Sequence, residues 1–401
     1  MTASETLYER ALKHIPWGTQ TNAKRPILEY SGTMPYFIER AKGCRFWDVD
    51  GDEYIDYRLS LGPVILGYGY PSVDAAVKEQ LEKGVLFSMA SPVEIELAEA
   101  ISRIVPSMEM VRFGKNGVDA NASNLRIARA YSGKDKMIRC GYNGYHDWFS
   151  TGISGNGVPR SLADYVYEVR YGDVEQVESI LKRDASSISC ILSSPYDFNE
   201  DISGDYPRAL RKLADEYGVI LIFDEVLTGF RLSIGGAQEY FGVRPDLSSF
   251  AKAVANGFPL SVFGGKRKHM QKLNDFVITA TYAGEALSIA AAIATLKVME
   301  KEKVHEHIYK MGRRLMDGFT AIAKRVGVEV KIGGFPVASY FLFDYKDADK
   351  NKKLHVELNR ELYKERVFVY DRWFMSFSHK EADIDLTLER FERALKKAVK
   401  D

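Results

Sequence analysis

VILIFDEVLTGF, from Val219 to Phe230, is the stretch that decides the fold class of this 401-residue chain. Its first five residues are apolar, which is typical of a strand buried on both faces in a parallel sheet covered by helices. The strand ends in two carboxylates, Asp224 and Glu225, at the edge of the sheet where such folds bind ligands. Taken alone, these carboxylates could cap a helix, form a structural ion pair, bind a metal or pair with a cationic ligand atom.

Helical and strand patterns alternate on both sides of this stretch. Helices are indicated by capping residues and closing glycines, and strands by short apolar runs that end in turns. The predicted helices cover residues 71–84, 91–105, 119–133 and 206–218, and the predicted strands cover 110–117, 189–194, 219–226, 247–253 and 261–266. This order predicts an α/β fold with a mainly parallel, doubly wound sheet and helices on both faces.

The two ends of the chain have a different texture. The N-terminal part begins with a short helix and ends in a predicted β-hairpin around Asp50 and Gly51. A long alanine-rich helix over 285–327 is followed by strands at 338–345 and 367–377 and a closing amphipathic helix at 383–401. We expect an N-terminal segment 1–60 that joins the small domain, a large domain 61–295 and a C-terminal small α+β domain 296–401.

Composition and charge exclude several classes of protein. Basic and acidic residues both number 55, so no net field favours nucleic acid or an anionic membrane. No stretch reaches the roughly 18 uncharged apolar residues of a spanning helix, and the start lacks the apolar core of a signal peptide. The three cysteines form no CxxC pair, which fits neither a disulfide framework nor a zinc site. We expect a cytoplasmic protein without a metal.

One lysine, Lys252, stands among small and apolar residues in SSFAKAVANGFPLSVFGG, which runs from Ser248 to Gly265 without an acidic residue. Burial disfavours the ammonium form, and the neutral amine is a nucleophile toward carbonyl groups. The ordinary alternative is a lysine that extends its charge from a strand end into solvent. Asp224 ends the preceding strand, so both side chains are expected in one crevice. Pyridoxal phosphate enzymes need such a pair, a Schiff-base lysine and an acid for the pyridinium nitrogen.

Two further segments could complete a site of that kind. FGKNGVDANASNLRIARA places a glycine turn, Gly114 to Gly117, between a strand and a helix whose N-terminal N–H groups suit a phosphate. Many such turns contain glycine for steric reasons alone. In CGYNGYHDWFSTG, an aromatic such as Tyr142 could stack on a flat ring, while Val226, two residues after Asp224 on the same side of the strand, packs on the other face. Each aromatic could equally fill a core.

In this order the segments resemble the class III aminotransferases, pyridoxal phosphate enzymes of fold type I, and within them the branch that contains glutamate-1-semialdehyde 2,1-aminomutase. The resemblance rests on MVRFGKNGVDANASNLRIARAYSGKDK, GYNGYHDW, LIFDEVLTGFRLSIGGAQEYFGVRPDLSSFAKAVANGFP and ATYAGEALSIAAA. It covers nearly the whole chain, from IPWGTQT near the start to FSHKEADID near the end.

The resemblance implies that Lys252 forms the internal aldimine and moves protons between the substrate's α-carbon and C4′ of the cofactor. It implies that Asp224 holds the pyridine nitrogen, that Val226 packs beneath the ring and that Tyr142 stacks above it. The implied phosphate contacts are Asn116, Gly117 and Val118, together with Thr281 from a neighbouring subunit. A homodimer with shared active sites is therefore expected.

Four departures from the family's pattern bear on the substrate. Val118 stands where a hydroxyl residue is common, Asn143 replaces the usual histidine after the stacking aromatic, and Ser194 in LSSPYDF replaces a carboxylate. The fourth is VFVYDRWFMSF, which has no clear match to the gating glutamate of the aminomutase. These changes fit either neutral drift or a changed substrate pocket, in which Trp17, Asn143 and Ser194 would contact the substrate.

These observations predict a transaminase that moves an amino group from an amino-acid donor to a small ketone or aldehyde, such as a sugar-like or secondary-metabolite carbonyl. GTQTNAKRP and FGKNG favour this reading over isomerisation of glutamate-1-semialdehyde. The nearest alternative is an aminomutase or an amino-acid racemase. A catalytically silent binding protein with the same fold is an alternative of another class. A metal hydrolase is disfavoured, because the seven histidines show no HExxH spacing.

Overall fold

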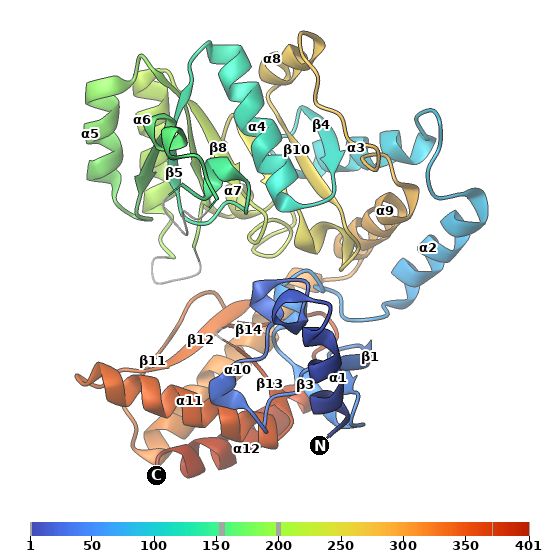
Figure 1. Cartoon of the computed structure of the whole chain (residues 1–401), viewed down its shortest axis with the longest axis vertical. Helices are drawn as coiled ribbons and strands as arrows, with labels where there is room; N and C mark the ends of the chain where they lie inside the picture. The colour runs from blue at the N-terminus through green and yellow to red at the C-terminus, as the bar shows by residue number, and fades with distance from the viewer. Residues whose placement is uncertain (1, 152–156, 198–201, 371, 401) are drawn as a thin grey trace. The chain divides into compact units, whose positions relative to one another are not determined.

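The computed structural model describes residues 2–151, 157–197, 202–370 and 372–400 (Figure 1). The chain forms two compact units, one of Pro71–His305 and one of Met1–Tyr70 with Glu306–Asp401. Phe198 of LSSPYDF and Asp371 of VFVYDRWFMSF lie outside the described residues.

The unit of Pro71–His305, called the large unit below, is built on a seven-stranded sheet. In spatial order its strands are β4 (Met110–Gly114), β10 (Ser261–Gly265), β9 (Leu247–Phe250), β8 (Ile220–Asp224), β7 (Ile188–Ser193), β5 (Lys136–Cys140) and β6 (Val166–Val169). The pairs from β9 to β6 are parallel, whereas β10 is antiparallel to both β4 and β9. The predicted mainly parallel α/β sheet is therefore confirmed, and β5 and β6 extend it beyond the predicted strands.

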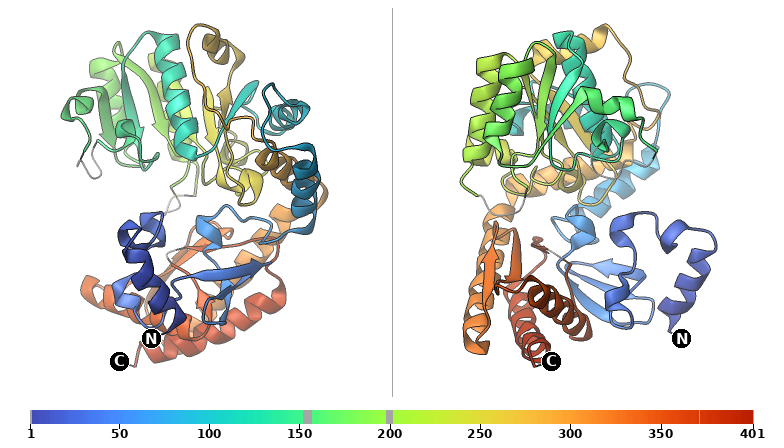
Figure 2. Two further views of the ribbon diagram at one scale, coloured as in Figure 1. Left: turned by 45° about the vertical axis from the view of Figure 1, so that its right-hand side comes forward. Right: turned by 60° about the vertical axis from the view of Figure 1, so that its left-hand side comes forward.

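Helices lie on both faces of this sheet (Figure 2), and every residue of β7 and β8 is buried. The helices of the large unit are α2 (Pro71–Lys83), α3 (Pro92–Ile104), α4 (Gly117–Ser132), α5 (Val174–Asp184), α6 (Asp205–Tyr217), α7 (Ala237–Phe241), α8 (Arg267–Met270) and α9 (Ala286–Lys301). The four helices predicted here correspond to α2, α3, α4 and α6. The apolar runs that predicted central strands therefore reflect burial on two sides, as expected.

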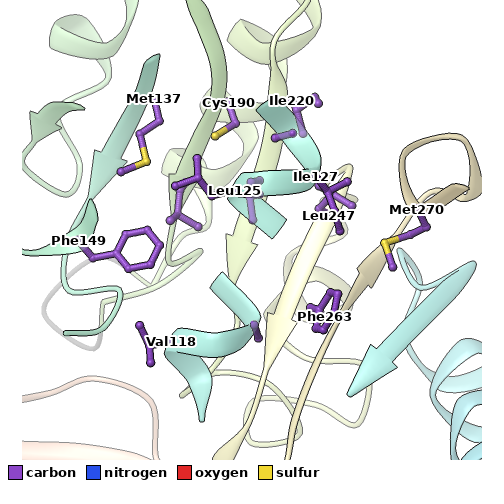
Figure 3. Close-up of a cluster of buried hydrophobic side chains, with 14 residues drawn as sticks. Val118, Leu125, Ile127, Met137, Phe149, Cys190, Ile220, Leu247, Phe263 and Met270 are labelled. Carbon is purple, nitrogen blue, oxygen red and sulfur yellow. The ribbon is translucent and has the colours of Figure 1, made fainter. Parts of the chain in front are cut away.

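Helix α4 is fixed to the sheet by a cluster of buried hydrophobic side chains (Figure 3). Val118, Leu125 and Ile127 of α4 gather with residues of five strands, namely Met137, Cys190, Ile220, Leu247 and Phe263. Burying a large apolar side chain stabilises a fold by about 1.5–3 kcal/mol. Because Val118 stands in the first turn of α4, this core also fixes where the helix begins.

The other unit contains two smaller sheets and longer helices. One sheet has the order β1 (Ile38–Lys42), β2 (Arg45–Asp48), β3 (Glu53–Asp56) and β13 (Val367–Phe368), and the other β11 (Val330–Gly333), β12 (Ala338–Phe343) and β14 (Trp373–Phe374). Its helices are α1 (Ala3–Leu12), α10 (Val304–Val326), α11 (Ala348–Lys364) and α12 (Glu381–Ala398). The hairpin predicted around Asp50 is the antiparallel pair β2–β3. The strand predicted over 367–377 is instead two short strands in separate sheets.

The long helix predicted over 285–327 is wrong as a single element. Helix α9 ends at Lys301 and α10 begins at Val304, with Glu302 in an extended conformation at φ −103° and ψ 136°. Helix α9 is buried almost all round, whereas α10 buries one row of side chains, Ile308, Met311, Leu315, Phe319 and Ile322. A break allows each helix to bury its own face. No proline or glycine marks it in the sequence.

Three features of the described residues bear on compartment and chemistry. Cys44, Cys140 and Cys190 are buried and free of disulfides. None of the described helices combines the length and the apolar character needed to cross a membrane. Within the same residues, no group of three or more histidine, cysteine, aspartate or glutamate side chains could hold a metal ion.

Candidate active site

One cavity of the large unit, about 400 Å³ in volume, brings together most of the residues predicted for the cofactor site. Its lining includes Asn116, Gly117, Val118, Tyr142, Asn143, Ser194, Asp224, Val226 and Lys252. These residues follow β4, β5, β7, β8 and β9 in the chain, and the last four are parallel strands whose carboxyl ends meet at one edge of the sheet. That edge is the ligand-binding edge of open α/β sheets.

Asp224 is the last residue of β8 and is 6% exposed. Its Oδ2 accepts hydrogen bonds from Nδ2 of Asn121 and Nδ2 of Asn143, both at 2.8 Å. Its Oδ1 accepts one from the Val226 N–H at 3.1 Å. Burial raises the pKa of the Asp224 carboxyl, while these donors and the charge of Lys252 act in the opposite direction. The result is a buried acceptor at a cavity wall, which suits a cationic ring nitrogen.

Val226 reaches the cavity from a turn and not from the strand. Because β8 ends at Asp224, the alternation of side chains along a strand does not extend to Val226. The Val226 N–H bond to Asp224 folds the chain back instead. Its methyl groups lie against Gly117, where an added Cβ would stand 2.7 Å from Val226 Cγ2. The absence of a side chain at Gly117 therefore lets the start of α4 approach Val226.

Lys252 is partly buried and begins a short 3-10 helix, Lys252–Ala255. Its φ of 46° lies in the left-handed region, which is strained for a residue with a side chain and recurs at functional sites. Burial lowers the pKa of its amine to about 8, against the effect of the Asp224 carboxylate and with that of Arg231. A large fraction of the amine is therefore neutral, hence nucleophilic, near pH 8.

The turn between β4 and α4 presents backbone donors to the cavity. The Lys115 and Asn116 N–H groups donate to Oδ2 of Asp119, at 3.1 Å and 2.7 Å. Gly117 and Val118 lie in the first turn of α4, where backbone N–H groups have no carbonyl partner within the helix. Among the described residues they are the donors left for an anion, at the positive end of the helix dipole.

Val118 and Gly144 join this turn to the loop that carries Tyr142. An added Cβ at Gly144, whose φ is +121°, would stand 2.4 Å from Val118 Cγ2. The Val118 side chain is buried and packs beneath the loop, which gives a physical reason for an apolar residue where a hydroxyl was expected. Tyr142 lines the cavity and is 72% exposed.

Ser194 lines the cavity, but its hydroxyl serves its own loop. Its Oγ donates to the carbonyl oxygen of Tyr196 at 2.5 Å. The change from carboxylate to Ser194 therefore removes a negative charge from the wall and replaces it with a turn contact.

Several lining residues were missed by sequence reasoning, namely Asn121, Tyr171, Tyr196, Asp197 and Leu227, whereas Tyr145 belongs to the aromatic loop considered for ring stacking. Asn121 could have been found, because it lies four residues after Gly117 and so on the same face of α4. The tyrosines carried no comparable signal, since an isolated aromatic is as typical of a core as of a ligand wall.

Two predicted residues lie elsewhere. Thr281 is exposed in a turn before α9 and does not line the cavity. Trp17 belongs to the other unit and is 50% exposed. The Arg25 guanidinium lies over its ring, 5.1 Å from the ring centre. Their assigned contacts stay predictions.

The donor set fits pyridoxal phosphate. The cavity offers an amine with a lowered pKa, a buried carboxylate and backbone donors at a helix N-terminus, which match the aldehyde, ring nitrogen and phosphate of that group. The amide oxygens Oδ1 of Asn121 and Asn143 are buried without a donor among the described residues, which is common where a bound group completes a site.

Comparison with known proteins points the same way. The family model for class III aminotransferases matches residues 28–189 and 199–365. The chain is 36% identical to the glutamate-1-semialdehyde 2,1-aminomutase of Methanococcoides burtonii, over 98% of this chain and 99% of that one. It is 34% identical to the 3-aminobutyryl-CoA aminotransferase of Cloacimonas acidaminovorans, over 98% and 97%.

Solved structures agree. The PLP internal aldimine form of the FumI protein from Sphingopyxis sp. MTA144 has a TM-score of 0.92 and 29% identity, and the alignment covers 99% of this chain and 97% of that one. A β-phenylalanine aminotransferase from Variovorax paradoxus, with a TM-score of 0.86, 23% identity and coverage of 99% and 94%, shares the fold. With the cavity and these alignments, the chain belongs to the class III aminotransferases, pyridoxal phosphate-dependent transaminases of fold type I.

Proposed function

We propose that this transaminase takes the amino group of an amino-acid donor and delivers it to a small ketone or aldehyde, such as a sugar-like or secondary-metabolite carbonyl. The observation that carries the proposal is the convergence of Lys252, Asp224 and the first turn of α4 on one cavity. Pyridoxal phosphate, when bound, supplies a ring that accepts the electrons of bonds broken at the amino-bearing carbon.

Each residue of the cavity has a proposed part in this reaction. The Lys252 amine takes the proton from the α-carbon of the donor and returns a proton at C4′ of the cofactor. Asp224 holds the ring nitrogen by its charge, and Val226 and Tyr142 hold the two faces of the ring. Gly117 and Val118 bind the phosphate through their N–H groups, next to Asn116.

The acceptor class is supported by the chemistry of the cavity wall. Tyr142, Tyr145, Tyr171 and Tyr196 line it, so its wall is rich in aromatic side chains, while the Tyr171 hydroxyl donates to the Pro195 carbonyl oxygen. Ser194 adds no charge. A small carbonyl compound with hydroxyl groups finds apolar faces and polar ends in such surroundings. Trp17, Asn143 and Ser194 are proposed to contact this substrate.

An aminomutase outcome is the second candidate, because the 36% identity to the Methanococcoides burtonii enzyme spans nearly the whole chain. Asn143 and Ser194 depart from the pattern expected of that branch, which is consistent with a changed substrate pocket.

The experiment that separates the two incubates the cofactor-loaded protein with single amino acids and follows the ultraviolet and visible spectrum. For a transaminase we expect conversion of the cofactor to its amine form with release of a free oxo acid, and recovery of the spectrum on adding a carbonyl acceptor. If every amino acid is returned as an isomer and none yields an oxo acid, the transfer proposal fails.

A homodimer with shared sites is proposed as the active assembly. From the last turn of α2 to the first turn of α3 the large unit exposes apolar side chains, Leu81, Val85, Leu86, Phe87, Met89 and Ile95. Met89 is 83% exposed, and a concentration of such residues is typical of a subunit interface. Thr281 is proposed to reach the phosphate of the neighbouring subunit.

Mixed subunits test this arrangement. Lys252→Ala and Thr281→Ala chains are each expected to be impaired as homodimers, whereas their hybrid has one site with both Lys252 and Thr281 intact. Recovery of activity on mixing supports a shared site. No recovery in hybrids that form, or a monomer in sedimentation, contradicts it.

The cytoplasm is the proposed compartment, because the three buried thiols form no disulfides. Cell fractionation of the native source tests this, and a secreted protein would contradict it.

A further inference from the structure

The Asp224 carboxylate is held by two asparagine amides on the same oxygen. Asn121 Nδ2 and Asn143 Nδ2 each lie 2.8 Å from Asp224 Oδ2. Asn121 Nδ2 also donates to the backbone oxygen of Asn143 at 2.9 Å, which closes a three-residue network. Asn121 is 1% exposed and Asn143 is 2% exposed, so water competes little for these bonds.

We propose that Asn121 and Asn143 are positioning residues that orient Asp224 toward the cavity and favour its charged form, through donors that do not themselves titrate. The proposal rests on the proposed role of Asp224 as the partner of the ring nitrogen. Hydrogen bonds donated to a carboxylate stabilise its charged form. An amide offers this at every pH, whereas a histidine changes its charge between about pH 5 and pH 8.

The charge on Asp224 fixes the orientation of both amides. With an ionised carboxylate, only the NH₂ end of each amide can face Oδ2, because a rotated amide would bring two oxygen atoms together. The Oδ1 atoms of both asparagines then have no donor in the described part of the chain, although both are buried.

The amides also leave one side of Asp224 open. Oδ2 accepts both amides, whereas Oδ1 accepts only the Val226 N–H at 3.1 Å among the described residues. A carboxylate oxygen has two lone pairs, so Oδ1 retains one for a ligand.

The titratable groups around Asp224 are few in kind. Lys252 faces it with a positive charge. Cys140, Tyr142, Tyr145, Tyr171, Tyr196 and Asp197 line the same cavity. The adjacent face of α4 presents Asn121, and β9 presents Ser249 beside Asp224. No histidine belongs to this described lining, and the two side-chain donors to Asp224 Oδ2 are amides, which do not titrate.

The test measures the dissociation constant of pyridoxal phosphate, by quenching of protein fluorescence, from about pH 5.5 to pH 9. Asn121→Ala and Asn143→Ala each remove one donor, and Asn143→His restores a donor that titrates. Asn124→Ala is the matched control, because Asn124 is buried one turn further along α4 and its Nδ2 donates to Ser248 O at 2.8 Å instead. Thermal unfolding of all four variants records their structural cost.

For Asn121→Ala and Asn143→Ala we expect the binding of pyridoxal phosphate to weaken by about tenfold or more at the acid end of the pH range and by much less at the alkaline end. The reason is that Asp224 is protonated more readily when it lacks a charge-assisted donor. Asn143→His should recover the alkaline affinity and add an inflection between about pH 5 and pH 8. Asn124→Ala should follow the parent curve.

Two results would overturn the inference. If the dissociation constants of Asn121→Ala and Asn143→Ala run parallel to those of the parent at all pH values, the two asparagines have a purely structural role. A pH-dependent loss in Asn124→Ala would show that any buried amide of α4 has the same effect. Neither result would affect the proposed transaminase, whose own failure is a parent protein that does not bind pyridoxal phosphate.

Discussion

Asp224 and Glu225 are neighbours in sequence, both are buried, and they serve opposite purposes. Glu225 points into the core, where it accepts hydrogen bonds from Thr228 Oγ1 at 2.6 Å, from the Ala237 N–H at 2.7 Å and from the Gln238 N–H at 2.9 Å. It thereby caps α7. Asp224 lines the cavity together with Lys252, whose positive charge interacts with the Asp224 carboxylate. The pair teaches that the role of a buried carboxylate depends on the groups that its side chain faces, not on burial itself.

The largest expected effect lies on the cavity side. Lys252→Ala should lower transamination by at least about 10²–10⁴-fold, because a positioned acid–base group contributes that much. Borohydride treatment should fix pyridoxal phosphate to the parent chain at Lys252 and not to the variant. Lys266→Ala is the control. Lys266 does not line the cavity, and its Nζ pairs with Asp246 Oδ1 at a distance of 2.6 Å. Equal activity of Lys252→Ala and the parent would remove this lysine from the reaction.

The second prediction exchanges the two carboxylates for amides. Asp224→Asn should lower the rate of amino transfer by about 10²-fold or more, as is usual when an electrostatic contact in an active site is lost. The stability of the cofactor-free protein should change little, because the substitution removes a desolvated charge. Glu225→Gln should lower the free energy of unfolding by about 1–3 kcal/mol, because its amide cannot satisfy all the core donors. Urea unfolding and the rate of amino transfer measure the two effects. The comparison breaks if both variants lose the same property.

Two glycines sharpen the comparison by steric means. Gly117→Ala places a Cβ 2.7 Å from Val226 Cγ2, and Gly236→Ala places one 2.8 Å from Glu225 Oε1 at a φ of +84°. Overpacking costs about 1–3 kcal/mol. We expect Gly117→Ala to weaken pyridoxal phosphate binding, and Gly236→Ala to lower the melting temperature instead. Adding Val226→Ala should relieve the first variant. A double variant that binds no better would rule out this contact as the cause.

The smallest expected effect concerns pH. Because burial lowers the pKa of Lys252 to about 8, capture of pyridoxal phosphate by the cofactor-free protein should accelerate as pH rises, with a midpoint near that value. Asp224 raises this pKa, so Asp224→Asn should move the midpoint to lower pH, whereas Glu225→Gln should leave it in place. Stopped-flow absorbance gives the rates. A midpoint close to the ordinary lysine value would contradict the burial of the amine.

Much of this arrangement could be predicted from sequence because it depends on local chemistry. The apolar run before Asp224 indicated a strand end, and the glycine turn before Val118 indicated a helix start. The isolated Lys252 indicated a buried amine. Other features escaped because the evidence for them is distributed. The break between α9 and α10 carries no proline or glycine, and the bond from Asn121 Nδ2 to the Asn143 carbonyl oxygen forms only when the loop after β5 is beside α4.

By itself the sequence determined the parallel α/β fold, the family and the placement of Lys252 and Asp224 at one cavity, since strand ends on one edge of a parallel sheet lie together. Only the tertiary structure decided that Val226 enters from a turn, that Val118 packs under the loop of Gly144, and that two amides hold one oxygen of Asp224. The physical reason is that such contacts depend on distances of a few ångströms between segments far apart in the chain, which no spacing along the sequence encodes.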